Sequence, residues 1–304
     1  MPDRMGGLEF SKTGLFIMDN GYESAGYMEE KFTNDALNPD LSANKNQTRN
    51  TAEDAGPDTC LHGGLNRDVI KYIAMFTMFL NHIANIFMEP GTLLTEFLID
   101  IGYFTAPVMC YFLVEGYYYT HSRLRYALRL ALFALVSEIP FCLAFTENGT
   151  LSFVGMDMIF TLLLCFLIIL TLDKVKNGFL KRVIAGALVV ASFYSDWAIF
   201  APVFTITFAG AYGNKKWEQR AFLAATILFG AVNGLINIGY VPLWMAVVYG
   251  LGTMIGPALA GFVIVKLYNG KRMERGRTFS QWFFYLFYPV HLLILGGIRV
   301  ALFC

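Results

Sequence analysis

Long apolar runs separated by short polar segments make up the chain after residue 64. The first run is NRDVIKYIAMFTMFLNHIANIFM, at residues 66–88, and eight more follow it. About 20 apolar residues are needed to cross the roughly 30 Å hydrocarbon core of a bilayer. The pattern therefore predicts an all-α integral membrane protein with about nine transmembrane helices. The runs lie at residues 66–88, 97–119, 126–145, 152–172, 180–194, 197–212, 221–238, 243–268 and 281–303.

Residues 1–64 have a different character, being polar and without sustained apolar periodicity. They contain eleven acidic and five basic residues and the stretch NPDLSANKNQTRNTAEDAGPDT. Such a composition is typical of a disordered segment. No apolar core follows a basic start, so we predict no cleavable signal peptide. The expected organisation is a disordered acidic tail at residues 1–64 and a membrane domain at residues 65–304.

Composition and charge agree with a multi-pass protein of the cell membrane. Hydrophobic residues make up 56% of the chain and charged residues 15%, whereas soluble chains have about 25% charged residues. Basic residues fall in every second loop, which by the positive-inside rule places these loops and the amino terminus in the cytoplasm. An odd number of spans then leaves Cys304 outside. We expect contact with the lipid bilayer and no nucleic-acid partner.

The five cysteines and four histidines lie far apart in sequence. They form no Cys-x-x-Cys pair and no Cys/His spacing typical of zinc ligands. We therefore predict no metal site.

Several ionisable or amide side chains interrupt the apolar runs, and these are the candidate catalytic residues. An ionised residue at the centre of a membrane helix costs about 2.5 to 3.5 kcal/mol, so these groups are expected to face one another or water. Counted along the helices, most fall in the outer half of the membrane. We therefore predict an outward-facing polar cavity. The candidates are Asn81, His82, Asp100, Glu138, Asp157 and His291.

Each candidate also has a structural interpretation. Asn81 and Asn85 are of a type that hydrogen-bonds between helices, and His82 is equally compatible with a satisfied structural histidine. Asp157 and Asp196 stand where they could cap helices.

Arg123, Arg125 and Arg129 stand at the cytosolic mouth of the third run. Three arginines there follow from positive-inside bias alone, yet guanidinium groups also bind phosphates bidentately. Together with Glu115 they form the predicted cofactor-binding set, and Glu115 is also expected to pair with Arg123 or Arg125. No phosphate-binding glycine loop accompanies them.

Residues 65–145 resemble the TraX family of conjugal-transfer proteins. The matching segments are LNRDVIKYIAMFTMFLNHIANIF, IGYFTAPVMCYFLVEGYYYTHSR and YALRLALFALVSEIPFCLAF, followed by MDMIFTLLL and SDW. YPVH at residues 288–291 is similar to the last-helix pattern of membrane acyltransferases. The resemblance implies N-terminal acetylation of a pilin subunit, with His82 as catalytic base. Family members often have Asp-His where this chain has Asn81-His82, so Asp100 or Asp157 would supply the acid.

We therefore predict a membrane-embedded acyltransferase. It would take an acyl group, with acetyl as the expected one, from cytosolic acyl-CoA. The acceptor would be an amine or hydroxyl on the outer side, such as a pilin-like peptide N-terminus or a cell-surface glycan. In this scheme His82 removes the acceptor's proton. Two alternatives remain open: a proton-coupled solute transporter, and a non-catalytic assembly factor for a surface appendage.

Overall fold

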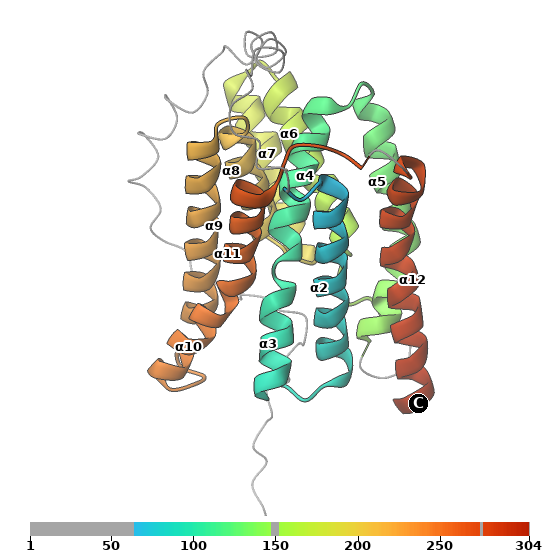
Figure 1. Ribbon diagram of the computed structural model, residues 1–304, viewed down its shortest axis with the longest axis vertical. Coiled ribbons are helices and arrows are strands. Elements are labelled where there is room, and N and C mark those ends of the chain that lie inside the picture. Colours follow the sequence, from blue (N-terminus) through green and yellow to red (C-terminus); the bar gives the residue numbers. More distant parts are fainter. Residues whose placement is uncertain (1–63, 147–151, 274–275, 304) are drawn as a thin grey trace, which may run out of the picture. The chain divides into compact units, whose positions relative to one another are not determined.

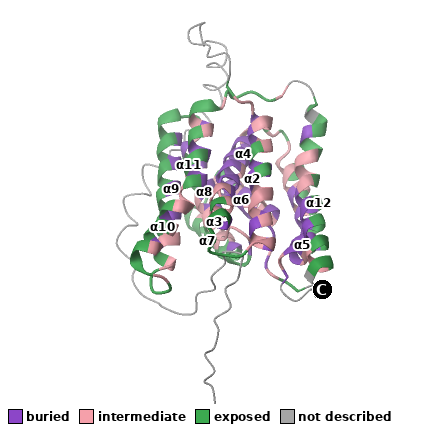
Figure 2. Ribbon diagram, turned by 60° about the horizontal axis from the view of Figure 1, so that its bottom comes forward, coloured by how far each residue is buried: buried purple, intermediate pink, exposed green. Residues whose placement is uncertain are grey.

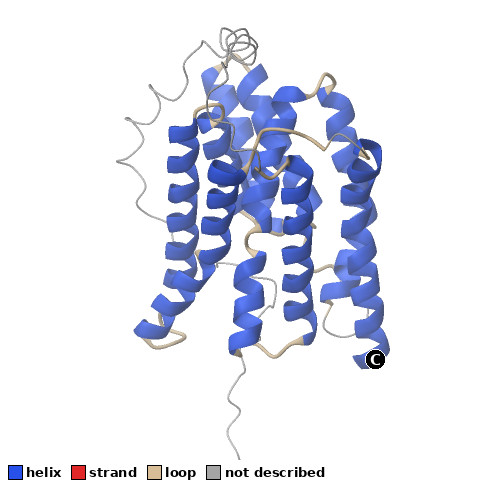
Figure 3. Cartoon of the chain, in the orientation of Figure 1, coloured by secondary structure: helices blue, strands red, loops and turns tan. Residues whose placement is uncertain are grey.

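The computed structural model describes residues 64–146, 152–273 and 276–303, and helices fill most of these ranges (Figure 3). Three isolated backbone bridges and no strand occur within them. The predicted tail, residues 1–63, and Cys304 lie outside the described residues. The helices are α2 (Arg67–Phe87), α3 (Leu93–Gly102), α4 (Thr105–Tyr119), α5 (Arg123–Phe145), α6 (Met158–Lys174), α7 (Gly178–Ala191), α8 (Phe200–Ala211), α9 (Lys215–Ile236), α10 (Leu243–Thr253), α11 (Ile255–Phe262) and α12 (Arg277–Phe303).

The predicted all-α membrane fold is confirmed, and the count of nine full spans is confirmed only in part. Two pairs of helices, α3 with α4 and α10 with α11, each continue one another across a short break, so the described chain forms nine helical segments. Six of these are long and apolar enough to cross a membrane. Helices α6, α7 and α8 have 17, 14 and 12 residues. They fall short of the roughly 20 residues that a full crossing requires.

Both helix breaks have a proline just after them. Pro107 lies in the first turn of α4 and Pro257 in the first turn of α11, where a missing N–H costs little. The two breaks also touch, because a Cβ on Gly256 would lie 2.5 Å from the Phe104 nitrogen. Only glycine allows this close approach between the two interrupted helices.

Helices α2, α4, α6 and α8 carry most of the buried surface, whereas exposed faces predominate on α9 and α10 (Figure 2). Many exposed side chains are large and apolar, among them Leu132, Leu135 and Ile139 on α5. A soluble protein rarely exposes so much contiguous apolar surface. These faces are suited to contact with lipid.

Helix α12 packs along α5 and also contacts α2 (Figure 1). Gly296 allows the close approach, since a Cβ there would lie 3.0 Å from the Ala144 nitrogen. Arg299 Nη1 donates to the Ala144 carbonyl oxygen at 2.8 Å. A cation at the carboxyl end of a helix is favourable, so Arg299, near the carboxyl end of α12, stabilises the carboxyl end of α5.

Candidate active site

His82 on α2 and His291 on α12 form a buried pair, although 209 residues separate them. His82 Nδ1 lies 2.8 Å from His291 Nε2. The rings are parallel to within 3°, with centroids 5.0 Å apart. The side chains are only 6% and 5% exposed. The contact brings the first and last helices of the membrane domain together at one level.

The hydrogen bonds fix which nitrogen of each neutral ring carries the proton. His291 Nδ1 lies 2.7 Å from the Phe287 carbonyl oxygen, which can only accept, so His291 Nδ1 carries a proton. Its Nε2 then accepts, and His82 Nδ1 must be the donor. Neutral His82 is left with a lone pair on Nε2. This nitrogen is a ready proton acceptor.

Tyr288 connects the histidine pair to the amino end of α6. Its ring centroid lies 6.3 Å from that of His82, and its hydroxyl oxygen accepts from the Met158 backbone N–H at 3.3 Å. The neighbouring Asp157 N–H donates to Glu138 Oε2 at 3.2 Å. The structure thus groups His82 and His291 with Tyr288, Asp157 and Glu138.

Asp157 is the N-cap of α6, because its Oδ1 accepts from the Phe160 N–H at 2.7 Å. The side chain is fully buried, and Oδ2 has no hydrogen-bond partner. Burial, opposed by the hydrogen bond from the Phe160 N–H and helped by the nearby charges of Glu138 and Asp196, raises the pKa of Asp157 to about 8. The carboxyl group is therefore largely protonated at neutral pH and is able to donate a hydrogen bond.

The segment before α6 is held against the turn before α8. Met156 N–H donates to the Tyr194 carbonyl oxygen, and Asp196 N–H donates to the Met156 carbonyl oxygen, both at 2.8 Å. Burial raises the pKa of Asp196 to about 7. The next residue, Trp197, has a positive φ of 61°, which is unusual outside glycine and asparagine. Two carboxyl groups are thus held close together near Tyr288, whose ring lies beside His82.

Asn81 and Asp100 lie elsewhere. Asn81 Nδ2 donates to the Ile99 carbonyl oxygen on α3 at 3.0 Å, and Asn85 donates to both the backbone and side-chain oxygens of Asn81. Asp100 faces α10, where its Oδ2 lies against Gly252 and leaves no room for a Cβ there. Asn81 therefore joins α2 to α3, and neither residue contacts His82.

The three predicted phosphate-binding arginines have three different environments. Arg123 forms an ion pair with Asp173 at 2.8 Å and lies over the Tyr117 ring. Arg125 is exposed. Arg129 lies over the Tyr126 ring, and its Nε is buried without a hydrogen-bond partner.

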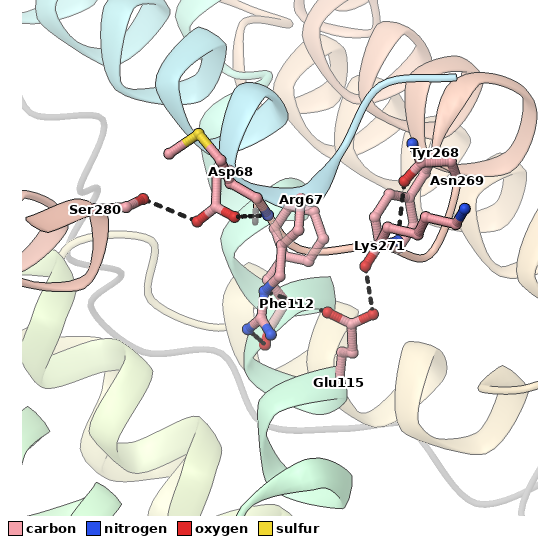
Figure 4. A network of polar contacts seen from close by, with 9 residues as sticks. Arg67, Asp68, Phe112, Glu115, Tyr268, Asn269, Lys271 and Ser280 are labelled. Carbon is pink, nitrogen blue, oxygen red and sulfur yellow. Dashed lines mark hydrogen bonds and ion pairs between the residues drawn. The ribbon is translucent and has the colours of Figure 1, made fainter. Parts of the chain in front are cut away.

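Glu115 pairs with Arg67, not with Arg123 or Arg125 as predicted from their closeness in sequence (Figure 4). Arg67 Nε lies 3.3 Å from Glu115 Oε2, and both side chains are buried. Tyr268 donates from its hydroxyl to Glu115 Oε1 at 2.6 Å. Because α4 runs back beside α2, the end of α4 meets the start of α2.

The same network holds the segment between α11 and α12 to α2 (Figure 4). Asp68 accepts from the Ser280 hydroxyl at its Oδ1 and from the Met273 N–H at its Oδ2, both at 2.8 Å.

Sequence reasoning missed Arg67 and Lys71 as site residues. Their spacing carried a signal, because at 3.6 residues per turn Arg67, Lys71 and His82 fall within about 60° on one face of α2.

Comparisons with known proteins identify the family of the chain. The family model described as "TraX protein" matches residues 66–299, which is most of the chain. This chain belongs to the TraX family. A protein of Dichelobacter nodosus, "Probable fimbrial assembly protein FimC, serogroup H1", is similar to it, with 30% identity over 240 residues. The aligned region covers 77% of this chain and 95% of that protein. No solved structure matches the chain.

The TraX match includes every residue of the candidate site, from Arg67 on α2 to His291 on α12. Apart from Leu65, it also includes the sequences that carried the resemblance at residues 65–145. The predicted membership of the TraX family is therefore confirmed. The match ends just before the last turn of α12 and excludes the predicted tail.

Proposed function

We propose that this TraX-family protein is a membrane acyltransferase. It takes an acyl group, with acetyl as the expected one, from cytosolic acyl-CoA and delivers it to an amine or hydroxyl at the outer face. The observation that supports this most strongly is the His82–His291 pair. Its hydrogen bonds leave a lone pair on His82 Nε2. A general base in acyl transfer needs such a lone pair to accept a proton.

In the proposed reaction the acceptor nitrogen or oxygen attacks the thioester carbonyl carbon. His82 Nε2 takes the proton that the acceptor loses, the carbon–sulfur bond breaks, and the proton passes to the CoA thiolate. His291 accepts the hydrogen bond from His82 Nδ1, and it holds the base ring in the required orientation and tautomer. Such sites generally combine a nucleophile, a base and a third group that orients the base, and His291 is that third group here.

From sequence, either Asp100 or Asp157 was expected to supply the acid of the site. We assign this role to Asp157, whose backbone N–H donates to Glu138. Asp157 lies next to Met158, whose N–H reaches Tyr288 beside His82. With its pKa raised by burial, Asp157 supplies a neutral carboxyl donor rather than a fixed negative charge. Asn81 and Asp100 receive no chemical role, because their contacts join helices.

A peptide N-terminus is the preferred acceptor, and a cell-surface glycan is the alternative. The similar protein of Dichelobacter nodosus is named for fimbrial assembly, and the resemblance to the TraX family implies a pilin subunit whose N-terminal amine is free after its signal is removed. An amine acceptor must reach the base unprotonated, which the apolar surroundings of His82 favour.

The test is transfer of labelled acetyl from acetyl-CoA by the full chain in lipid nanodiscs. Acceptors are a peptide with a free N-terminus, the same peptide with a blocked N-terminus, and a lipid-linked glycan. We expect label on the free-amine peptide, loss with His82→Ala, and retention with His121→Ala, which changes an exposed histidine. Absence of label on every acceptor, with folded protein and intact donor, would contradict the proposal.

The name of the relative supports a second candidate, a non-catalytic assembly factor for a surface appendage. This candidate predicts that appendage assembly in cells survives His82→Ala when the protein level is unchanged. The acyltransferase predicts unacylated subunits in those cells.

A further inference from the structure

Four basic side chains lie towards the amino ends of helices α2, α5 and α12, and the amino end of α2 is the end farther from His82. Arg67 and Lys71 come from α2, Arg129 from α5, and Arg272 from the segment before α12. Arg67 and Arg272 lie within electrostatic reach of Lys71, and Arg67, Arg129 and Arg272 within reach of the Tyr126 hydroxyl. We call these four residues the basic cluster.

The acids around the basic cluster do not balance it. Glu115 is occupied by Arg67 and Tyr268, and both oxygens of Asp68 accept hydrogen bonds from Ser280 and Met273. Four basic groups, three of them arginines, therefore face two carboxylates in the described part of the chain. Within a membrane domain a charge without a counter-ion is costly, so a bound anion would stabilise the basic cluster.

Two of the cations retain donors for such an anion. Arg129 Nε is buried without a hydrogen-bond partner. Lys71 Nζ lies 4.9 Å from the Phe284 ring centroid and 5.7 Å from that of Phe112, and it takes part in none of the ion pairs of the described residues. A guanidinium on α5 and an ammonium on α2, each with Arg67 in its surroundings, supply the kind of donors that an oxygen-rich dianion accepts.

We propose that the basic cluster binds the diphosphate of a phosphate-bearing ligand, which under the proposed function is the acyl-CoA donor. Helix α2 sets the spacing. His82 follows Lys71 by eleven residues on the same face, or about 16 Å at 1.5 Å per residue. An extended pantetheine arm covers a distance of this order, so the thioester reaches His82 when the diphosphate is at Lys71.

This proposal changes which arginines bind the donor. Arg123 is paired with Asp173, and the Arg125 side chain is exposed. Of the three arginines singled out in the sequence, Arg129 alone belongs to the basic cluster. Arg125 is therefore a matched control, one helical turn away from Arg129 and identical in charge.

The experiment measures binding of CoA, without acyl transfer, to the full chain in nanodiscs of phosphatidylcholine. We expect inorganic pyrophosphate to compete with CoA. A charge-assisted hydrogen bond is worth about 1.5 to 3 kcal/mol, so Arg129→Gln and Lys71→Gln should each weaken CoA binding about 10- to 100-fold. Arg125→Gln should change it less than threefold. Equal effects of Arg129→Gln and Arg125→Gln in folded protein would overturn the proposal.

A second arm separates CoA from a lipid headgroup as the source of the phosphate. Native mass spectrometry and thermal shifts are recorded with and without phosphatidylglycerol in the nanodiscs. Stabilisation by phosphatidylglycerol that depends on Arg129, without CoA binding, would overturn the assignment to the donor. Binding of CoA that depends on Arg129, without acyl transfer, would support the basic cluster and contradict the proposed function. Acyl transfer by Arg129→Gln with an unchanged Michaelis constant for acyl-CoA would contradict the basic cluster and support the proposed function.

Discussion

His82 and His291 share a hydrogen bond of 2.8 Å between parallel rings, so the first and last membrane helices together define one base. Each ring depends on a hydrogen-bond partner for its tautomer and orientation. His291 is fixed by the Phe287 carbonyl oxygen, and His82 is fixed by His291. The proposed acyl transfer depends on this order of donors and acceptors, and the predictions below test it and its surroundings.

His291 is predicted to act as a positioning residue. His291→Ala should lower turnover by about 10²-fold, within the range of general-base effects, because His82 Nδ1 loses its acceptor. His291→Gln should restore part of the loss, since its carbonyl oxygen can accept the same hydrogen bond. Turnover and the Michaelis constant for acetyl-CoA are measured separately, and the latter should stay within threefold. Equal turnover of the Ala and Gln variants would rule out the positioning role.

The buried Asp157 predicts that stability depends on pH. Because its pKa is raised from 3.8 to about 8, the folded state holds a proton that the unfolded state releases across that interval. The free energy of unfolding should therefore fall as the pH rises from about 4 to about 8 and level off above. Asp157→Asn keeps the N-cap, because asparagine also accepts from the backbone. Its Tm should change less between pH 6 and pH 8 than that of the wild type.

Asn81 is predicted to be structural. Asn81→Ala removes the hydrogen bond to the Ile99 carbonyl oxygen and should lower stability by about 1 kcal/mol. Turnover per folded molecule should stay within threefold, since Asn81 does not contact His82. The measurement is Tm and turnover on one preparation. A large fall in turnover with an unchanged Tm would give Asn81 a part in the chemistry.

The Arg67–Glu115 ion pair predicts an asymmetry between single and double variants. Glu115→Leu leaves a buried guanidinium without its partner and should cost about 3 to 5 kcal/mol. Arg67→Met combined with Glu115→Leu should recover most of that loss. Denaturation of the two single variants and the double variant, as a thermodynamic cycle, gives the coupling free energy. A coupling near zero would mean that the ion pair is held by its surroundings alone.

The sequence predicted the class of fold because apolar length is a local property. It did not predict the breaks at Tyr103 and Met254, which follow from Pro107 and Pro257 and from the contact of Gly256 with Phe104. It also overcounted full spans, because a polar boundary does not show how far a short apolar helix reaches across the membrane.

The candidate site was predicted only in part, because the sequence shows local patterns and not contacts between distant residues. His82 and His291 were recognised one by one, but a contact across 209 residues has no local signal. Asn81 was a catalytic candidate next to His82 in sequence, but adjacent residues on a helix point about 100° apart, and Asn81 donates to the Ile99 carbonyl oxygen. Glu115 was matched to the nearest arginines, whereas the return of α4 alongside α2 brought it to Arg67.

The most direct measurement of the central claim is single-turnover acyl transfer by His82→Ala, with Tm and CoA binding determined on the same preparation. Loss of a general base lowers the rate about 10²- to 10⁴-fold. We predict a fall of at least 10²-fold, with CoA affinity within threefold of wild type and a folded protein. Most of the wild-type rate per folded molecule in His82→Ala would contradict the assignment of His82 as the base.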